Sequence, residues 1–343
     1  MTSLTVTRTN APGDEWDAFV RTQAHWTAYH LAAWQRTCAG ALGHETIYLE
    51  AREPATRVLH GVLPLVRVRS ALFGHFLVSM PFVNYGGPLG SVDAIQALVK
   101  HAEGLATQDR VDLLELRSRT PLPIDLPASH RKVSVLLDLP DTTEALFKSF
   151  PAKLRSQVRR PQKEGVTVRM GPEVLPDFFR VFSEHMRDLG TPTHGSALFN
   201  TLSQEFGNDA WIAVAYLNNI PIACGLGFRW AREFEITWAS SLREHSRIAP
   251  NMLLYWELMQ RAVAEGCSIF NFGRCTPDSN THRFKLQWGG RDETLYWYQR
   301  ARGAHSGTPS PDAGPFSYGP RIWRKLPLAI ANSIGPRVVR LIP

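Results

Sequence analysis

The same order of predicted elements occurs twice along this chain. In each half, amphipathic helices are followed by a hairpin of two strands, a third strand, a long helix and a further strand. An order of this length that recurs indicates one architecture used twice, with a separate core in each copy. The sequence therefore predicts an α+β protein of two similar domains, at residues 1–140 and 141–301.

Turn and cap residues support both copies. Pro54 lies in the predicted turn of the first hairpin, and Asn218 with Asn219 forms the turn of the second. Asparagine suits that turn because it tolerates a positive φ. The long helix of the first half begins at Ser91, a good N-cap, and the long helix of the second half ends before Gly266.

Two further segments follow the second domain. Residues 302–320 are rich in Gly, Pro and Ser and are predicted to be a linker. Residues 321–343 mix five cations with apolar side chains, a composition that suits a short amphipathic element on an anionic membrane face. The alternative is a helix that docks on the protein's own surface.

The composition excludes several classes of protein. With 343 residues, 44% of them hydrophobic, the chain can bury two cores. Its four cysteines are scattered without metal-ligand spacing, so we expect no metal site, no disulfide framework and a reducing cytosol. We expect no signal peptide, because residues 1–14 are polar and contain no apolar h-region, and no membrane span, because no run reaches ~18 apolar residues. The net charge of +7 favours phosphate-bearing partners.

One stretch of the second half combines cations, rings and a polar loop. A predicted strand carries Asn271 and ends near Arg274, and Phe284, Lys285 and Trp288 come after the loop. A loop that leaves a strand end and is lined in this way suits an anionic ligand with flat or acyl parts. The alternative is that the rings belong to the core and the cations are solvated.

Three other places are candidate binding sites. Arg155 and Arg159 are four residues apart in a basic segment, so they share a helix face and can hold a phosphate bidentately. Asn84 and Tyr85 lie in a glycine-containing loop that a ligand can approach closely. Asn251 lies at a predicted helix start, where free N–H groups bind an anion or acyl oxygen. The alternatives are a solvated helix face and surface turns.

Together these residues resemble the FemAB-like acyltransferases. More narrowly, they resemble the FemAB-like proteins associated with exosortase/PEP-CTERM exopolysaccharide loci. The resemblance covers nearly the whole chain and is carried by Arg155 with Arg159, Asn251, residues 270–274, Phe284-Lys285 with Trp288-Gly289, residues 79–87, residues 115–117 and the basic tail.

The resemblance implies two GNAT-like domains with a substrate cleft between or beside them. Characterised relatives move an amino acid from aminoacyl-tRNA to an amine of a peptidoglycan precursor. The resemblance places Phe284 and Lys285 beside the tRNA acceptor end and Arg155 at the sugar-nucleotide phosphates. Asn271 and Cys275 depart from the Asp and Ser expected there, so no carboxylate role carries over to position 271.

Two further departures concern the donor. The coiled-coil arm that binds tRNA in some family members is missing, because residues 165–172 are too short for it. Acyl-CoA enzymes of the GNAT type usually hold the pyrophosphate on a glycine-rich loop, but residues 244–249 contain no glycine. We expect no cofactor to stay bound, and the acyl donor to be either aminoacyl-tRNA or acyl-CoA.

The sequence thus predicts a cytoplasmic acyl- or aminoacyltransferase that forms an amide on a cell-envelope or exopolysaccharide precursor. Its tail would contact the inner face of the membrane. Lys285 and Arg274 are the predicted catalytic residues, because cations can stabilise an oxyanion. Asp278 and His282 are candidate bases by position only. The alternatives are a GNAT-type N-acyltransferase that uses acyl-CoA and a non-catalytic binder of a lipid-linked precursor.

Overall fold

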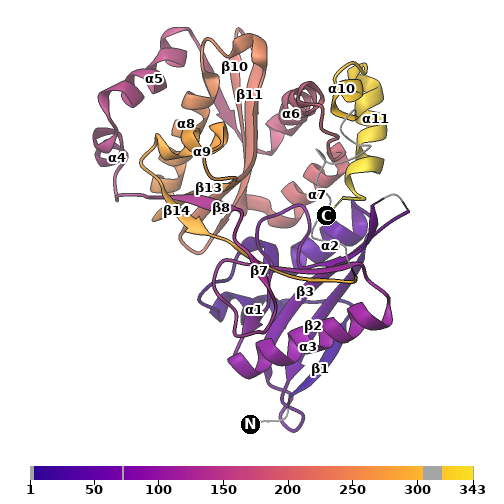
Figure 1. Cartoon of the computed structure of the whole chain (residues 1–343). Coiled ribbons are helices and arrows are strands. Elements are labelled where there is room, and N and C mark those ends of the chain that lie inside the picture. The colour runs from indigo at the N-terminus through magenta and orange to yellow at the C-terminus, as the bar shows by residue number, and fades with distance from the viewer. Residues whose placement is uncertain (1–3, 72, 304–318, 343) are drawn as a thin grey trace. The chain divides into compact units, whose positions relative to one another are not determined.

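The computed structural model describes residues 4–71, 73–303 and 319–342 (Figure 1). The chain divides into two compact units, and each unit has its own sheet and core. The first unit comprises Met1–Lys132, Thr294–Pro311 and Arg340–Pro343, and the second comprises Val133–Glu293 and Asp312–Val339. The predicted α+β class with two sheets is confirmed.

The sheet of the first unit is built from two hairpins and a parallel pair of strands. Its described strands follow the order β1-β2-β3-β4-β6-β15-β7, and β5 pairs with β3. The neighbours β4 and β6 run parallel, whereas the other pairs are antiparallel. The strands are β1 (Thr5–Thr9), β2 (Glu45–Arg52), β3 (Leu59–Ser70), β4 (Gly74–Val78), β5 (Leu89–Gly90), β6 (Leu113–Ser118), β7 (Ala128–Ser129) and β15 (Tyr296–Ala301).

One long helix covers the core of the first unit. It is α3 (Val92–Gln108), and the Ser91 side chain accepts a hydrogen bond from the backbone of Ala94, as an N-cap should. Its buried residues Leu98 and Ala102 pack against apolar side chains of β2, β3 and β6. Two shorter helices, α1 (Asp14–Thr22) and α2 (Ala32–Gly40), complete the unit with the 3-10 turn η1 (Ala28–His30).

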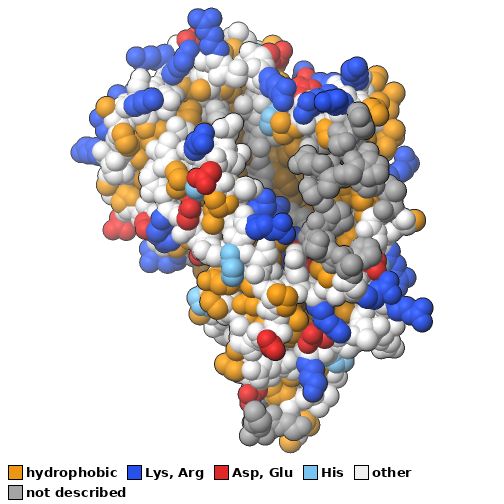
Figure 2. Space-filling model, viewed as in Figure 1, with side chains coloured by type: hydrophobic (Ala, Val, Ile, Leu, Met, Phe, Trp, Pro, Cys, Tyr) orange, Lys and Arg blue, Asp and Glu red, His pale blue; other side chains and the backbone are white. Residues whose placement is uncertain are grey.

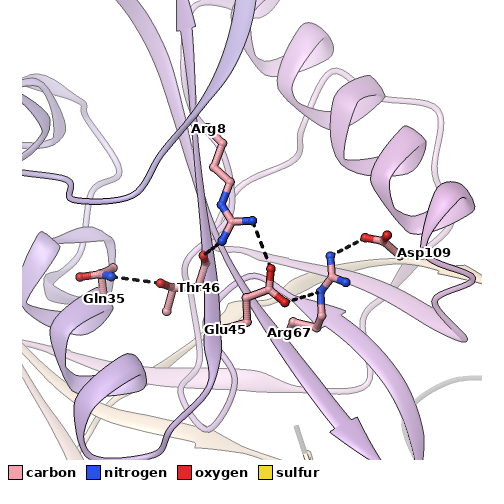
Figure 3. A network of polar contacts seen from close by, with 6 residues as sticks. All are labelled: Arg8, Gln35, Glu45, Thr46, Arg67 and Asp109. Carbon is pink, nitrogen blue, oxygen red and sulfur yellow. Dashed lines mark hydrogen bonds and ion pairs between the residues drawn. The ribbon is translucent and has the colours of Figure 1, made fainter.

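A polar network joins three strands of this sheet to the end of α3 (Figure 3). Glu45 on β2 accepts a hydrogen bond from Arg8 on β1 at 3.1 Å and pairs with Arg67 on β3 at 3.3 Å. Arg67 is buried and also donates to Asp109, the C-cap residue of α3. Two carboxylates offset the cost of burying this guanidinium, so the network fixes α3 against the strands.

The sheet of the second unit contains the other parallel pair. Its described strands follow the order β14-β8-β13-β12-β11-β10-β9, and β12 and β13 are parallel. The hairpin turn of β10 and β11 has Asn218 and Asn219 at φ values of 50° and 62°, which confirms that predicted turn. The strands are β8 (Val133–Asp138), β9 (Thr167–Met170), β10 (Ala210–Leu217), β11 (Ile220–Trp230), β12 (Glu233–Ser241), β13 (Ile269–Cys275) and β14 (Arg291–Thr294).

Helices cover both faces of this second sheet. Figure 1 shows α8 and α6 on opposite faces of β10 and β11, and both helices contact these strands. An aromatic cluster that includes Phe178, Phe182 and Phe199 fixes α6 against α7. The helices are α4 (Thr143–Ser149), α5 (Ala152–Lys163), α6 (Leu175–Leu189), α7 (Ser196–Phe206), α8 (Pro250–Ala264) and α9 (Asn280–Leu286), with 3-10 turns η2 (Pro172–Val174), η3 (Gly207–Asp209) and η4 (Arg243–His245).

The basic tail packs on the second unit. It forms α10 (Gly319–Trp323) and α11 (Leu328–Val339), and both contact α6. Ala331 and Gly335 are buried, and a side chain at Gly335 would lie 3.0 Å from the carbonyl oxygen of Thr193. One face of the tail is therefore docked, as the sequence-based alternative stated. Among the described residues, no helix is long and apolar enough to cross a membrane.

The structure divides the chain differently from residues 1–140 and 141–301. The first segment of the first unit ends at Lys132, and β8, expected in the first domain, pairs instead with β13 in the second sheet. Conversely β15, expected as the last strand of the second domain, pairs with β6 in the first. Each sheet thus takes one of its inner strands from the other half of the sequence. The order of elements along the chain does not show such an exchange. Most of the predicted linker at 302–320 lies outside the described residues.

Candidate functional site

A cleft opens in the second unit where its two parallel strands part. The recorded pairing of β12 with β13 runs only from Glu233 with Ile269 to Glu235 with Asn271. Beyond that point β12 continues to Ser241 along β11, while β13 shifts its register against β8. The separation leaves a cleft beside the last residues of β12.

The wall of this cleft combines amide, hydroxyl, imidazole and aromatic groups. Asn251 lies at the start of α8, and Phe284 lies on α9. The sequence predicted both as substrate-binding residues, and the structure brings both to this cleft. The lining residues are His185, Ala239, Ser240, Ser241, Asn251, Leu254, Tyr255, Asn280, Thr281 and Phe284.

The cleft also contains an imidazole–hydroxyl pair that sequence reasoning missed. Nδ1 of His185, on α6, lies 2.9 Å from Oγ of Ser240, near the end of β12. Burial, helped by the nearby Arg243, lowers the pKa of His185, although Asp188 acts in the opposite direction. A pKa below its ordinary value keeps the His185 imidazole mainly in the neutral form at pH 7. The position of Ser240, near the end of one of the two parallel strands, was the signal that would have pointed here.

The loop before α8 uses its own backbone amides. In residues 242–249, the N–H groups of His245, Ser246, Ile248 and Ala249 donate to carbonyl oxygens within the same turns. Pro250, the first residue of α8, has no N–H group. Ala249 precedes it at φ 57°, in the left-handed region. This helix start therefore presents few free N–H groups to a pyrophosphate. The anion site predicted at Asn251 depended on such free N–H groups.

A buried polar cluster lies between the parallel strands. The side-chain amide of Asn271 donates to Glu233 at 2.7 Å and to Glu235 at 3.2 Å, and its oxygen accepts from the Gly273 backbone at 2.8 Å. Asn271 and Glu235 are fully buried, and Glu233 nearly so. Asn271 is thus held inside the sheet and is not among the residues that line the cleft.

Lys285 turns its ammonium toward the end of β13. Nζ donates to the carbonyl oxygens of Gly273 at 2.7 Å and Arg274 at 2.9 Å, and only 4% of the residue is exposed. Burial lowers the pKa of Lys285 to about 8. The sequence predicted that this ammonium faces a cleft, whereas in the structure it faces the backbone of β13. Gly273 reaches the required backbone conformation at φ 70°.

The other predicted residues between positions 270 and 290 do not lie together in one site. Trp288 is 1% exposed and packs against Phe150 and Tyr255 in the core, so it belongs to the hydrophobic cluster of the second unit. Arg274 is exposed. His282 accepts from the Asp278 backbone through Nδ1, and its Nε2 lies 2.8 Å from Asp292. Both ring nitrogens of His282 therefore make contacts that hold the start of α9 in place.

Helix α5 presents the predicted cationic surface. Arg155 and Arg159 line one shallow concavity with Arg160 and Lys163, and Figure 2 shows Lys and Arg side chains over this part of the molecule (upper left). Arg155 donates to the carbonyl oxygen of Phe150, and Arg159 lies 5.0 Å from the centre of the Phe147 ring. The two guanidiniums share a helix face, as predicted from their spacing.

The first unit has a separate cleft. Tyr85 lies in its wall, and the guanidinium of Arg119 lies 5.0 Å from the centre of the Tyr85 ring. His30 also lines it and is held by the carbonyl oxygen of Gly87 at 3.1 Å. Asn84 is buried and is not among the lining residues. Of the two predicted loop residues, the structure therefore brings Tyr85 to a cleft.

The parallel strands of the first unit do not part as those of the second unit do. After β4, the backbone of Ser79 bonds to Glu115 on β6, and its hydroxyl accepts from the Arg117 backbone at 2.8 Å. The buried side chain of Arg117 then donates to the carbonyl oxygen of Val83 at 2.9 Å and pairs with Glu115 at 2.7 Å. Side chains thus fill the position that is open in the second unit.

Comparison with known proteins assigns the fold. The acetyltransferase (GNAT) domain family matches residues 148–286, which contain the second-unit cleft. The crystal structure of FemX superposes with a TM-score of 0.63 at 15% identity over 86% of this chain and 97% of that chain. A tandem GNAT protein from the clavulanic acid biosynthesis pathway superposes with a TM-score of 0.52 at 13% identity over 89% of this chain and 100% of that chain. The molecule is a tandem GNAT-fold protein, which confirms the predicted fold class.

A curated relative also matches by sequence. The UDP-N-acetylmuramoylpentapeptide-lysine N(6)-alanyltransferase of Weissella viridescens is 23% identical over 154 residues. That match covers 43% of this chain and 45% of the relative, so the matched region spans less than half of that enzyme. With the FemX superposition, it supports the similarity to the FemAB-like acyltransferases that the motifs indicated.

Proposed function

We propose that this protein is an acyltransferase that joins an activated acyl or aminoacyl group to an amine of a cell-envelope precursor, with the new bond formed in the second-unit cleft. The observation that carries the proposal is where this cleft lies. It opens at the point where the parallel strands of a GNAT sheet part, next to the start of a helix and among polar side chains.

The wall of the cleft fits the chemistry of acyl transfer. The carbonyl oxygen of the donor gains negative charge as the amine attacks, and hydrogen-bond donors stabilise that charge. The amides of Asn251 and Asn280 and the hydroxyl of Thr281 line the cleft and supply such donors. Lys285 acts by positioning the end of β13, because its ammonium is already bonded to two backbone carbonyls there.

An aminoacyl ester of tRNA is the donor that the second unit favours. A CoA thioester needs free backbone amides for its pyrophosphate, and the turns before α8 use theirs internally. An RNA acceptor end needs cationic side chains instead, and α5 offers Arg155, Arg159, Arg160 and Lys163 on one surface.

The acceptor is an amine on a precursor that carries anionic groups. The activity for which the Weissella viridescens relative is named, alanyl transfer to a lysine of a peptidoglycan precursor, supports this choice. The motif similarity to FemAB-like proteins of exosortase loci favours an exopolysaccharide precursor as the alternative to a peptidoglycan precursor. In the first unit, Arg119 and His25 line a cleft that suits an anionic part of such a molecule. We place the reaction in the cytoplasm, at the inner face of the membrane.

Two donors offered to the purified protein test the proposal. Alanyl-RNA acceptor-stem helices and acetyl-CoA are each incubated with UDP-N-acetylmuramoyl-pentapeptide or with lipid-linked amino sugars. Mass spectrometry then detects acylated acceptor. We expect product from the aminoacyl ester. Binding of a precursor without any amide product would support the non-catalytic alternative, and product from acetyl-CoA alone would support the GNAT-type alternative.

A pair of variants on one helix then locates the reaction. Thr281 and Leu286 are both exposed on α9, but only Thr281 lines the cleft. Thr281→Trp should fill the cleft and abolish transfer, while Leu286→Trp should leave it unchanged. Equal activities of the two variants would place the chemistry elsewhere.

A further inference from the structure

The cleft of the second unit contains one side chain suited to taking a proton at neutral pH. Among its ten lining residues only His185 and Tyr255 are titratable. Burial raises the pKa of Tyr255 far above neutrality, so its hydroxyl stays protonated and cannot act as a base. The neutral imidazole of His185 has one nitrogen that accepts a proton.

The contact with Ser240 orients this imidazole. Ser240 is 6% exposed and lies on a strand that pairs with β11, so its hydroxyl has a fixed position. When Nδ1 donates to that hydroxyl at 2.9 Å, the lone pair of the ring lies on Nε2. In the described part of the chain, the structure records no other hydrogen bond to this ring. The charged groups that act on it are Arg243 and Asp188.

We propose that His185 is the general base that takes the proton from the acceptor amine. This inference rests on the proposed function. It adds a role for which Asp278 and His282 are poorly placed, because neither lines the cleft and both ring nitrogens of His282 are held by Asp292 and the Asp278 backbone. An amine attacks only through its free electron pair, so removal of its proton is part of the reaction.

The proton balance of the step is simple. The amine nitrogen forms a C–N bond to the donor carbonyl carbon, and its proton moves to Nε2 of His185. The C–O bond to the ribose of the donor then breaks, and the imidazolium returns the proton to the ribose oxygen. The products are an amide and a free ribose hydroxyl, and His185 is neutral again. Ser240 acts as a positioning residue for the ring.

The test compares His185→Gln and Ser240→Ala with the wild-type protein in alanyl transfer from the charged RNA helix. His185→Gln should lower kcat about 100-fold or more, the ordinary contribution of a general base, with KM little changed. Ser240→Ala keeps the base and should lose less. His101→Gln, on α3 outside both clefts, is the matched control and should keep wild-type activity.

Chemical rescue separates a base from a structural histidine. Imidazole added to His185→Ala should restore part of the lost rate, and should not stimulate the wild-type protein or a Thr281→Trp variant. A His185→Gln variant that folds and keeps wild-type kcat would overturn the inference alone. A fall in kcat in His185→Ala that imidazole does not reverse would also overturn it. A wild-type protein without transfer from any donor would overturn the proposed function itself.

Discussion

The side-chain amide of Asn271 donates to the carboxylate of Glu233 at 2.7 Å inside the sheet of the second unit. The same amide reaches Glu235 at 3.2 Å, so one neutral side chain holds two buried carboxylates on the neighbouring strand. An ionised aspartate at position 271 has no N–H to donate and would put a third carboxyl group beside these two. This is a physical reason for asparagine where the family resemblance led us to expect aspartate.

Asn271→Asp should therefore destabilise the protein by about 3–5 kcal/mol at neutral pH, the range for an uncompensated buried charge. The loss should shrink as the pH falls, because a protonated aspartate can donate again. Denaturant unfolding measured across pH checks both statements. Asn208→Asp makes the same change at an exposed position and should shift stability by less than about 0.5 kcal/mol. Equal stability of the two variants would contradict this account of the cluster.

The sequence predicted the elements of this fold well because their signals are local. Ser91 caps α3 and the Asn218-Asn219 turn joins β10 to β11, and both depend on neighbouring residues only. The exchange of β8 and β15 between the two sheets depends on pairing over long separations, such as Tyr298 with Leu116. Periodicity carries no information about partners at that distance, so the predicted boundary at residue 140 was misplaced.

The candidate site was predicted in part, for a similar reason. Phe284 was predicted from its resemblance to a position beside the tRNA acceptor end, and Asn251 from its place at a helix start. Both line the cleft, and their roles there stay predictions. Lys285 was expected to face the same cleft, but helix α9 begins at Asn280, where a loop was expected, and turns the lysine toward β13. His185 sits on an amphipathic helix with no motif around it, so only the folded structure brings it to Ser240.

The stability contribution of Lys285 should depend on pH. Its pKa is about 8 in the folded protein against an ordinary value of 10.5, so between these values the unfolded chain binds a proton that the folded protein does not. Folding stability contributed by this group therefore rises with pH across that window. Below about pH 8, the free-energy cost of burying a charged ammonium offsets the stability that its two hydrogen bonds contribute.

Lys285→Met makes this dependence measurable. Near pH 7 we expect a small change in the free energy of unfolding, because lost hydrogen bonds and a relieved buried charge oppose each other. Above about pH 8 the variant should fall increasingly below the wild-type protein, because the uncharged lysine still donates to the carbonyls of Gly273 and Arg274. Lys148→Met, at an exposed position, should show no such trend. A stability difference that is flat across pH would contradict a depressed pKa at Lys285.

Charge reversal on α5 tests the anion surface. Arg155→Glu should weaken the binding of a short RNA acceptor-stem helix by roughly 1–3 kcal/mol, the range for hydrogen bonds to charged groups. The effect should diminish at high salt, because exposed charges are screened. Fluorescence anisotropy measures the affinity, and Lys100→Glu on α3 provides the same reversal away from this surface. An RNA affinity unchanged by Arg155→Glu, or equally reduced by both variants, would remove the role given to Arg155.

The exposed side of the tail should bind an anionic membrane. Although Ala331 and Gly335 of α11 are buried, Ile322, Ile330 and Ile334 are 64%, 44% and 40% exposed. The segment from Arg321 to the C-terminus contains five cations and no acid. Isoleucines that enter the acyl boundary and cations that meet lipid phosphates are complementary to such a surface.

Neutralising three of these cations provides the measurement. The full chain with Arg321, Arg324 and Lys325 changed to Gln should lose about 3 kcal/mol of binding, roughly 100-fold, since each cation near an anionic surface contributes about 1 kcal/mol. Co-sedimentation with phosphatidylglycerol-containing vesicles measures this loss, and purely zwitterionic vesicles should bind little of either protein. Ile322→Ser should weaken binding without changing its salt dependence, because it removes apolar contact and no charge. Identical co-sedimentation of the wild-type and neutralised chains at low salt would show that the tail serves only to pack against α6.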